Sequence, residues 1–268
     1  MSEFVIGQIY NRRRDIHDRF GGQRQSGIVT PAQTSLVFVF TGRGKRHGYH
    51  DEWSPDGTFR YVGEGQKGDM TLTKGNKAVA NHAADGKDLL LFEMLRSGQI
   101  RFRGPFNCAG YSIESGKDQH GNTRKVIVFH LVPIADEGAE IEPPPLPPTG
   151  ASLDELRKKA MAAAGPARES SRQGSKKTYR LRSQIIRQYV LARAKGICES
   201  CDAPAPFKTS AGVLYLEPHH IRRLTDGGPD DPRFMGAICP NCHREIHHGA
   251  NGIKRNLELQ ERVTAKEP

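Results

Sequence analysis

The chain contains no long hydrophobic run. None of its apolar stretches approaches the roughly 18 residues that a membrane-spanning helix needs, and the mean hydropathy is −0.62. The N-terminal residues show no basic segment followed by an apolar one, so no secretory signal is expected. These absences argue against a membrane protein and predict a cytoplasmic location.

Cysteine is also scarce, with only five residues among 268. Four of them form two C-x-x-C pairs, Cys198 with Cys201 and Cys239 with Cys242, and Cys108 stands alone. An odd number with this spacing argues against a disulfide framework and for a metal in a reducing compartment. Two such pairs suit one tetrahedral Zn²⁺ ion, whereas a redox site would need only one pair.

Acidic residues are too few to balance the basic ones. Forty Lys and Arg against thirty Asp and Glu give a formal charge of +10. A basic excess of this size favours a polyanionic partner, because Lys and Arg displace counterions from phosphates. Charge that serves only solubility is the alternative.

Three parts are expected along the chain: a β-rich unit at 1–135, a linker at 136–177 and a C-terminal domain at 178–268. Turn residues separate short β-branched and aromatic segments in the first part, which predicts a sandwich or a partly open barrel in an α+β protein. Strands are expected at 35–40, 58–62, 88–92, 100–103, 107–113 and 125–132, with one helix at 76–84.

The linker is identified by the five prolines of Pro143-Pro-Pro-Leu-Pro-Pro148, which favour an extended spacer. A capping box at Ser152 predicts a short helix to about Ala164, and the basic, Ser-rich and Gly-rich stretch 167–177 is expected to be mobile. A further helix is expected at 178–195, ended by Gly196.

Closely spaced histidines follow near the C-terminus. They lie in Leu216-Glu-Pro-His219-His220-Ile and in Cys239-Pro-Asn-Cys242-His243-Arg-Glu-Ile-His247, with Asp226-Gly227-Gly228 between. In this order and spacing the segments resemble the HNH nucleases, over residues from about 180 to 255. The resemblance implies a zinc-stapled ββα-metal fold that hydrolyses phosphodiester bonds with a divalent cation, Mg²⁺ or Mn²⁺.

The resemblance also implies a role for each histidine. His220 would be the general base, since an imidazole titrates near working pH. His219 and His247 would bind the cation, and His243 precedes His247 by four residues, on the same helix face. Phe234 stands where many relatives carry an Asn, so the working set is His219 and His220 with either His243 or His247.

A second ordered set of motifs lies in the first part of the chain. It includes His47-Gly-Tyr49-His-Asp51-Glu52, then Phe59-Arg-Tyr61-Val62-Gly63-Glu-Gly65 and Gly75-Asn76-Lys-Ala78. These motifs resemble SRA (SET and RING associated) domains, which read modified cytosine by flipping it out of the duplex. Val62 stands where family members keep a Thr, so the mark is 5-methylcytosine, 5-hydroxymethylcytosine or another modification.

The SRA resemblance implies a pocket and two DNA-contacting loops. Tyr49 and Tyr61 would sandwich the flipped base beside Gly63, and Asp51 or Glu52 would accept a hydrogen bond from the cytosine amine. In a β-rich domain the two tyrosines are otherwise core or cross-strand residues. The residues expected to contact DNA from the loops are Arg24, Gln25, Gln66, Lys67 and Lys74.

Together these observations predict an endonuclease that binds double-stranded DNA carrying modified cytosine and works as a homodimer, because one nuclease core cuts one strand. Two alternatives stay open. One is a non-catalytic, zinc-containing DNA-binding protein, and the other is an HNH nuclease that reads a different mark, such as phosphorothioate.

Overall fold

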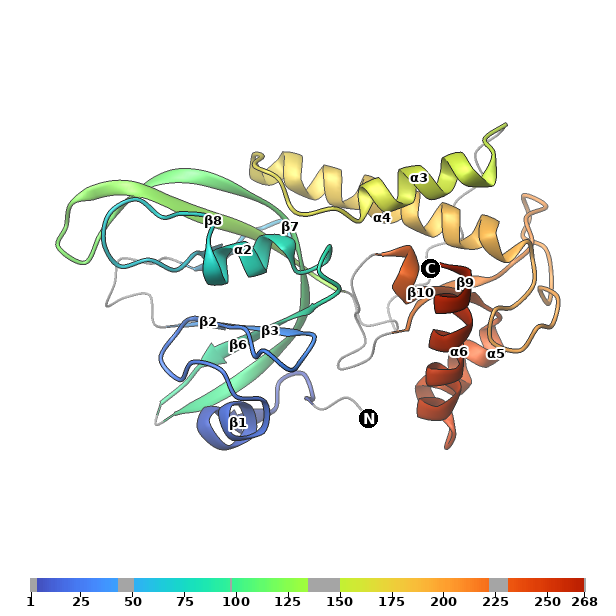
Figure 1. Cartoon of the computed structure of the whole chain (residues 1–268), viewed down its shortest axis with the longest axis horizontal. Helices are drawn as coiled ribbons and strands as arrows, with labels where there is room; N and C mark the ends of the chain where they lie inside the picture. Colours follow the sequence, from blue (N-terminus) through green and yellow to red (C-terminus); the bar gives the residue numbers. More distant parts are fainter. Residues whose placement is uncertain (1–3, 43–50, 97, 135–149, 222–230, 268) are drawn as a thin grey trace. The chain divides into compact units, whose positions relative to one another are not determined.

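The computed structural model describes residues 4–42, 51–96, 98–134, 150–221 and 231–267. Contacts divide the chain into two compact units (Figure 1). The N-terminal unit comprises Ser2–Ala135 and Pro166–Tyr179, and the C-terminal unit comprises Met1, Asp136–Gly165 and Arg180–Pro268. No helix in the described ranges combines the length and the apolar character needed to cross a membrane.

The N-terminal unit is built on one sheet of eight strands in the order β2-β3-β6-β7-β8-β5-β4, with β1 also paired to β7. The sheet is open, because β2 and β4 stand at its two ends, so the expected α+β fold with a barrel that does not close is confirmed. Its strands are β1 (Ile9–Asn11), β2 (Ile28–Val29), β3 (Leu36–Thr41), β4 (Glu52–Trp53), β5 (Phe59–Val62), β6 (Asp88–Met94), β7 (Gln99–Lys117) and β8 (Thr123–Pro133).

Strand β7 differs from the prediction of two separate strands at 100–103 and 107–113. Gly104, with φ +115°, lies between the two predicted strands, but the strand continues through it. The register with β8 shifts between Cys108 and Gly110, and such a bulge bends a strand without ending it. The fully buried side chains of Phe92, Phe102 and Phe129 form part of the core of this unit.

Among the described residues before 135, the sheet is accompanied by the helices η1 (Arg12–His17), α1 (Asp18–Phe20) and α2 (Lys74–Asn81). Helix α2 contacts β2 and β7 and buries Val79 and Ala80 in the core. It begins two residues before the helix expected at 76–84 and ends three residues earlier.

The stretch 167–177, expected to be mobile, is ordered against the N-terminal sheet. Its backbone donates hydrogen bonds from Ala167 to the carbonyl of Ala80 and from Ser170 to that of Tyr111, each 2.8 Å long. A Cβ at Gly110 would lie 2.3 Å from the Ser175 hydroxyl, so the close approach needs glycine there. Composition alone does not reveal such docking, because the bonds are to backbone distant in sequence.

The C-terminal unit contains a β-hairpin followed by two helices. Strand β9 pairs with β10 in antiparallel fashion, His219 opposite Gly236, and α5 follows β10 directly. Its elements are α3 (Leu153–Ala163), the part of α4 (Arg172–Ala194) from residue 180, β9 (Glu217–His220), η3 (Pro232–Phe234), β10 (Met235–Ile238), α5 (Pro240–His248) and α6 (Gly252–Lys266). The capping box at Ser152 is present as predicted.

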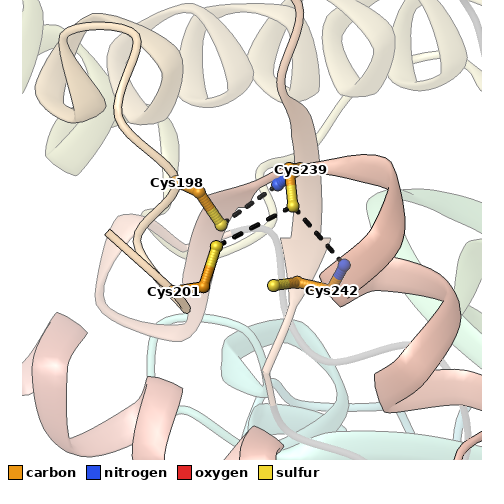
Figure 2. Close-up of side chains that lie close together, drawn as sticks. All are labelled: Cys198, Cys201, Cys239 and Cys242. Carbon is orange, nitrogen blue, oxygen red and sulfur yellow. Dashed lines mark hydrogen bonds between the residues drawn. The ribbon is translucent and has the colours of Figure 1, made fainter. Parts of the chain in front are cut away.

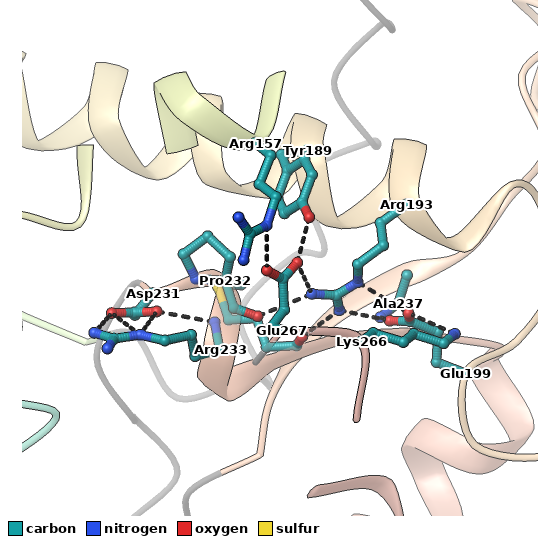
Figure 3. Close-up of polar contacts among 11 residues, drawn as sticks. Arg157, Tyr189, Arg193, Glu199, Asp231, Pro232, Arg233, Ala237, Lys266 and Glu267 are labelled. Atoms are coloured by element: carbon teal, nitrogen blue, oxygen red, sulfur yellow. Dashed lines mark hydrogen bonds and ion pairs between the residues drawn. The ribbon is translucent and has the colours of Figure 1, made fainter. Parts of the chain in front are cut away.

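A buried ionic network holds this unit together (Figure 3). Arg193 on α4 is 8% exposed and forms a two-pronged pair with Glu199, at 3.0 and 2.8 Å. It also donates to Glu267 at 3.1 Å, and Glu267 accepts from Arg157 of α3 at 2.8 Å. Because Glu199 lies between Cys198 and Cys201, the network fixes the first cysteine pair to helix α4.

Candidate metal centres and nuclease site

The four cysteines of the two C-x-x-C pairs meet at one point (Figure 2). Cys198 and Cys201 follow α4, while Cys239 caps the N-terminus of α5 and Cys242 lies in its first turn. Their sulfur atoms all lie within 4.8 Å of one another, and those of Cys201 and Cys239 are 4.0 Å apart. A tetrahedral zinc ion with bonds of about 2.3 Å holds its sulfurs about 3.8 Å apart, so the set fits zinc.

Burial shapes the protonation of this cluster. It raises the pKa of the Cys198 and Cys242 thiols, because it disfavours the charged thiolate. A bound divalent cation reverses this preference, since metal ligands must be thiolates. The cluster is therefore suited to a cation, and Cys108 lies outside it, buried in the N-terminal core.

A second potential metal site is formed by His219 on β9 with His243 and His247 on α5. One nitrogen from each ring lies within 4.8 Å of the others, and the ring centroids are 4.8–5.3 Å apart. The four-residue spacing places His243 and His247 on one face of α5. Imidazole nitrogens are ligands for divalent transition metals, so the three rings fit a cation.

Hydrogen bonds orient two of these rings. His243 Nδ1 lies 2.5 Å from Glu217 Oε2, and His219 Nε2 lies 3.0 Å from Asn256 Oδ1. Burial by itself raises the pKa of the Glu217 carboxyl, but hydrogen bonds with His243 and Tyr215 outweigh it and lower that pKa. Because an ionised carboxylate only accepts, His243 donates from Nδ1 and keeps the Nε2 lone pair for a cation.

Neither Glu217 nor Asn256 was given a role from the sequence. Glu217 lies two residues before His219, and alternate residues of a strand share a face, so this spacing was a usable signal. Asn256 lies on a buried position of α6, and a polar residue in an apolar stripe was the only indication there.

The neighbouring His220 is not a member of the three-histidine cluster. Glu217 and His219 are buried on one face of β9, whereas Pro218 and His220 are half-buried on the other. Ile221 beyond it donates its backbone N–H to the carbonyl of Phe234 at 2.9 Å, so Phe234 contributes its backbone where relatives carry an Asn. Asp226, Gly227 and Gly228 lie outside the described residues.

In the N-terminal unit, the predicted pocket residues occupy different environments. Tyr61 on β5 is 3% exposed and belongs to the hydrophobic core cluster of this unit. Asp51 accepts from the backbone N–H of Val62, the residue after Tyr61, at 2.9 Å and from Thr41 Oγ1 at 2.7 Å. Glu52 is exposed and pairs with Arg60 at 2.6 Å. Tyr49 lies outside the described residues.

Gly63 lies directly after the end of β5, two residues beyond Tyr61, and packs against helix α2. A Cβ at this position would lie 2.6 Å from Asn76 Oδ1, so Gly63 is required by packing of α2 against the end of β5. Asn76 is 2% exposed.

The five residues predicted to contact DNA are all exposed. Arg24 pairs with Asp18 at 3.5 Å, and Lys74 opens α2 with φ +47°. Sequence reasoning missed Glu64, which accepts from Ser26 Oγ at 2.7 Å and from Gly75 N at 3.2 Å. Glu64 thus connects the two predicted loops by hydrogen bonds. The five exposed residues are Arg24, Gln25, Gln66, Lys67 and Lys74.

Comparison with known proteins identifies both regions. A model of the ScoMcrA-like SRA domain matches residues 6–144, and a model of the HNH endonuclease domain matches residues 198–249. Both resemblances noted in the sequence are thereby confirmed.

Individual relatives cover the chain to different extents. The type IV methyl-directed restriction enzyme EcoKMcrA of Escherichia coli K12 is 42% identical over 79 residues, which are 30% of this chain and 28% of that protein. The structure of the type IV phosphorothioation-dependent endonuclease ScoMcrA is 25% identical, with a TM-score of 0.42, over 97% of this chain and 63% of that one. The modification-dependent endonuclease TagI is 19% identical, with a TM-score of 0.38, over 92% and 79%.

Proposed function

Because more than half of this chain matches the ScoMcrA-like SRA model, it belongs to that family, and it carries an HNH endonuclease domain. From this premise we propose that it is a modification-dependent DNA endonuclease. In this proposal the N-terminal unit binds modified cytosine flipped from the duplex. The C-terminal unit holds a structural zinc ion on its four cysteines and cleaves the DNA.

The observation that carries the nuclease proposal is the arrangement of the four histidines. His219, His243 and His247 direct nitrogens to one point, while His220 stands at the strand end outside that cluster. His219, His243 and His247 would hold a divalent cation, which when bound would supply Lewis-acid stabilisation of the phosphate and the leaving oxygen. Three imidazoles suit a transition-metal ion, whereas Mg²⁺ prefers oxygen ligands. His220 would take the proton from the attacking water. In this arrangement three histidines bind the metal and a different histidine acts as the base.

The proposal for the N-terminal unit is supported by the position of a predicted pocket carboxylate. Asp51 is fixed at the end of β5 by the hydrogen bond that it accepts from Val62 N. A carboxylate accepts from the exocyclic amine of cytosine, which supports recognition of a cytosine base. A flipped base costs a few kcal/mol of lost stacking, which stacking on Tyr49 and Tyr61 would offset.

The test is a cleavage panel with Mg²⁺ or Mn²⁺ on one DNA sequence that is unmodified, 5-methylated, 5-hydroxymethylated or phosphorothioated. Faster cleavage of the cytosine-modified duplexes is expected, and Tyr49→Ala should abolish that preference while the protein stays folded. Equal cleavage of all four duplexes would sink the selectivity. Preference for phosphorothioate would assign the other mark.

The second candidate, a non-catalytic DNA-binding protein, is favoured by Phe234 at the position where relatives carry an Asn. His220→Ala separates the two. We expect a rate about 10²- to 10⁴-fold lower, with His248→Ala as the matched control, because His248 is exposed on the same helix as His247. No cleavage by the wild type with any divalent ion would favour the second candidate.

A homodimer follows from the nuclease proposal, since a double-strand break requires two cuts. Two cores acting together should release linear DNA from a supercoiled plasmid without accumulating the nicked form. Sedimentation of the protein on modified DNA measures the oligomer directly, and a monomer that only nicks would contradict it.

A further inference from the structure

A buried asparagine on α6 contacts β9 and the residue that follows it. Asn256 is 8% exposed and shares the buried face of α6 with Gly252, Leu259 and Val263. Leu259 and Val263 are ordinary core side chains, but a buried amide needs hydrogen-bond partners. Asn256 has two, the ring of His219 and the backbone carbonyl of Ile221, which stand on either side of His220 in the chain.

The two contacts fix the orientation of the amide and then of the imidazole. A backbone carbonyl only accepts, so the Asn256 nitrogen must face Ile221 and donate to it. Asn256 Oδ1 is then the atom 3.0 Å from His219 Nε2, and that nitrogen must carry a proton to donate. In the neutral ring this makes Nδ1 the nitrogen with the lone pair.

Helix α6 is itself held firmly enough to impose this geometry. Leu259, one turn after Asn256, packs on Gly236 of β10, where a Cβ would lie 3.1 Å from the leucine. Arg255 pairs with Glu245 of α5 at 2.7 Å. Because both strands of the hairpin and α5 thus contact α6, Asn256 cannot shift without moving the core.

We infer that Asn256 is a positioning residue of the nuclease site. It keeps the Nδ1 lone pair of His219 available to a cation, and it binds the side chain of the residue before His220 and the backbone of the residue after it. The inference rests on the proposed metal-dependent cleavage. It gives helix α6 a part in the nuclease site, although α6 lies beyond the residues that the HNH model matches.

The experiment measures Co²⁺ affinity by calorimetry on full-length protein with zinc left on the cysteines. His243→Ala identifies the heat that belongs to the histidine cluster. Asn256→Leu removes both contacts and fills the space, and Asn256→Asp keeps an oxygen for His219. Leu259→Ala is the stability control, because it loosens α6 without touching His219, and Asn251→Ala is the matched control for an exposed asparagine of the same segment.

Asn256→Leu should bind Co²⁺ about 10- to 100-fold more weakly, the usual cost of losing a partner of a metal ligand. Its cleavage rate should fall at saturating metal while its DNA affinity stays unchanged. Asn256→Asp should stay within about threefold of wild-type Co²⁺ affinity, and so should Leu259→Ala despite a lower melting temperature.

An Asn256→Leu variant with wild-type Co²⁺ affinity would overturn the inference. An equal loss of Co²⁺ affinity in Asn256→Leu and Leu259→Ala would overturn it too, because Asn256 would then act only through packing. Failure of the proposed function is distinct from both. In that case the wild type itself would bind no Co²⁺ at the histidines and would cut no DNA.

Discussion

The two units of this protein are stabilised in different ways. The N-terminal unit buries a continuous apolar core against one sheet, with Phe38, Phe92 and Phe102 fully inaccessible. The C-terminal unit has a small hairpin and places four thiols, three imidazoles and a buried ionic network around it. The C-terminal unit also buries an apolar cluster that includes Ile186, Val190 and Leu259. The difference teaches that this unit adds potential metal ligands and buried charges to its packing, whereas the N-terminal unit packs its core against one large sheet.

Removal of the proposed zinc ion is the strongest way to separate the units. Structural zinc in small domains contributes about 10–16 kcal/mol of apparent binding free energy, which is comparable with the whole stability of a domain. Cys242→Ser or a chelator should therefore abolish the calorimetric transition of the C-terminal unit and leave that of the N-terminal unit. Cys108→Ser is the control, and loss of both transitions would contradict the comparison.

The buried ionic network should give the next largest effect. Arg193→Met leaves Glu199 and Glu267 buried with fewer partners, and removal of one partner from a buried pair costs about 3–5 kcal/mol. Arg262→Ala breaks an exposed pair with Asp202 and should change stability by less than about 1 kcal/mol. Urea unfolding of the C-terminal unit measures both, and equal effects would refute a special role for burial.

Acid should weaken the C-terminal unit through Glu267. Burial alone raises the pKa of this carboxyl, but hydrogen bonds with Tyr189, Arg157 and Arg193 hold it below its ordinary value. A lowered folded-state pKa gives stability that is fully present above the unfolded pKa of about 4.3 and is lost as pH falls through the folded value. Melting curves between pH 7 and 3 should show this loss, and Glu267→Gln should make it smaller.

A smaller effect is expected at the carboxylate behind His243. Glu217→Gln keeps the shape but loses the charge that fixes the proton on His243 Nδ1, so Co²⁺ affinity at the histidines should fall about 10-fold or more. Glu258→Gln, exposed on α6, is the matched control. An unchanged affinity would show that the imidazoles orient themselves without a charged partner.

The last effect is expected in the N-terminal unit. Gly63→Ala places a methyl group 2.6 Å from Asn76 Oδ1, and overpacking of this kind costs about 1–3 kcal/mol. The N-terminal transition should fall and the C-terminal one should not. If stability is unchanged while binding to modified DNA is lost, Gly63 acts on the ligand rather than on packing.

Local spacing explains which parts of the molecule were predictable. The two C-x-x-C pairs and the four-residue step from His243 to His247 are fixed by chain geometry over a few residues, so sequence was sufficient to group them. The capping box of α3 was found for the same reason. The continuity of β7 was missed, because pairing with β6 and β8 along its length overrides the glycine at 104.

The sequence by itself determined the family of both units, the two sets of potential metal ligands and the open, β-rich N-terminal fold. Only the tertiary structure decided which side chains orient those ligands, since Asn256 reaches His219 across 37 positions and Glu64 joins loops far apart in the chain. It also decided that 166–179 belongs to the N-terminal unit. The physical reason is the same in each case: ligand spacing is written locally, whereas hydrogen bonds between distant elements depend on how the core packs.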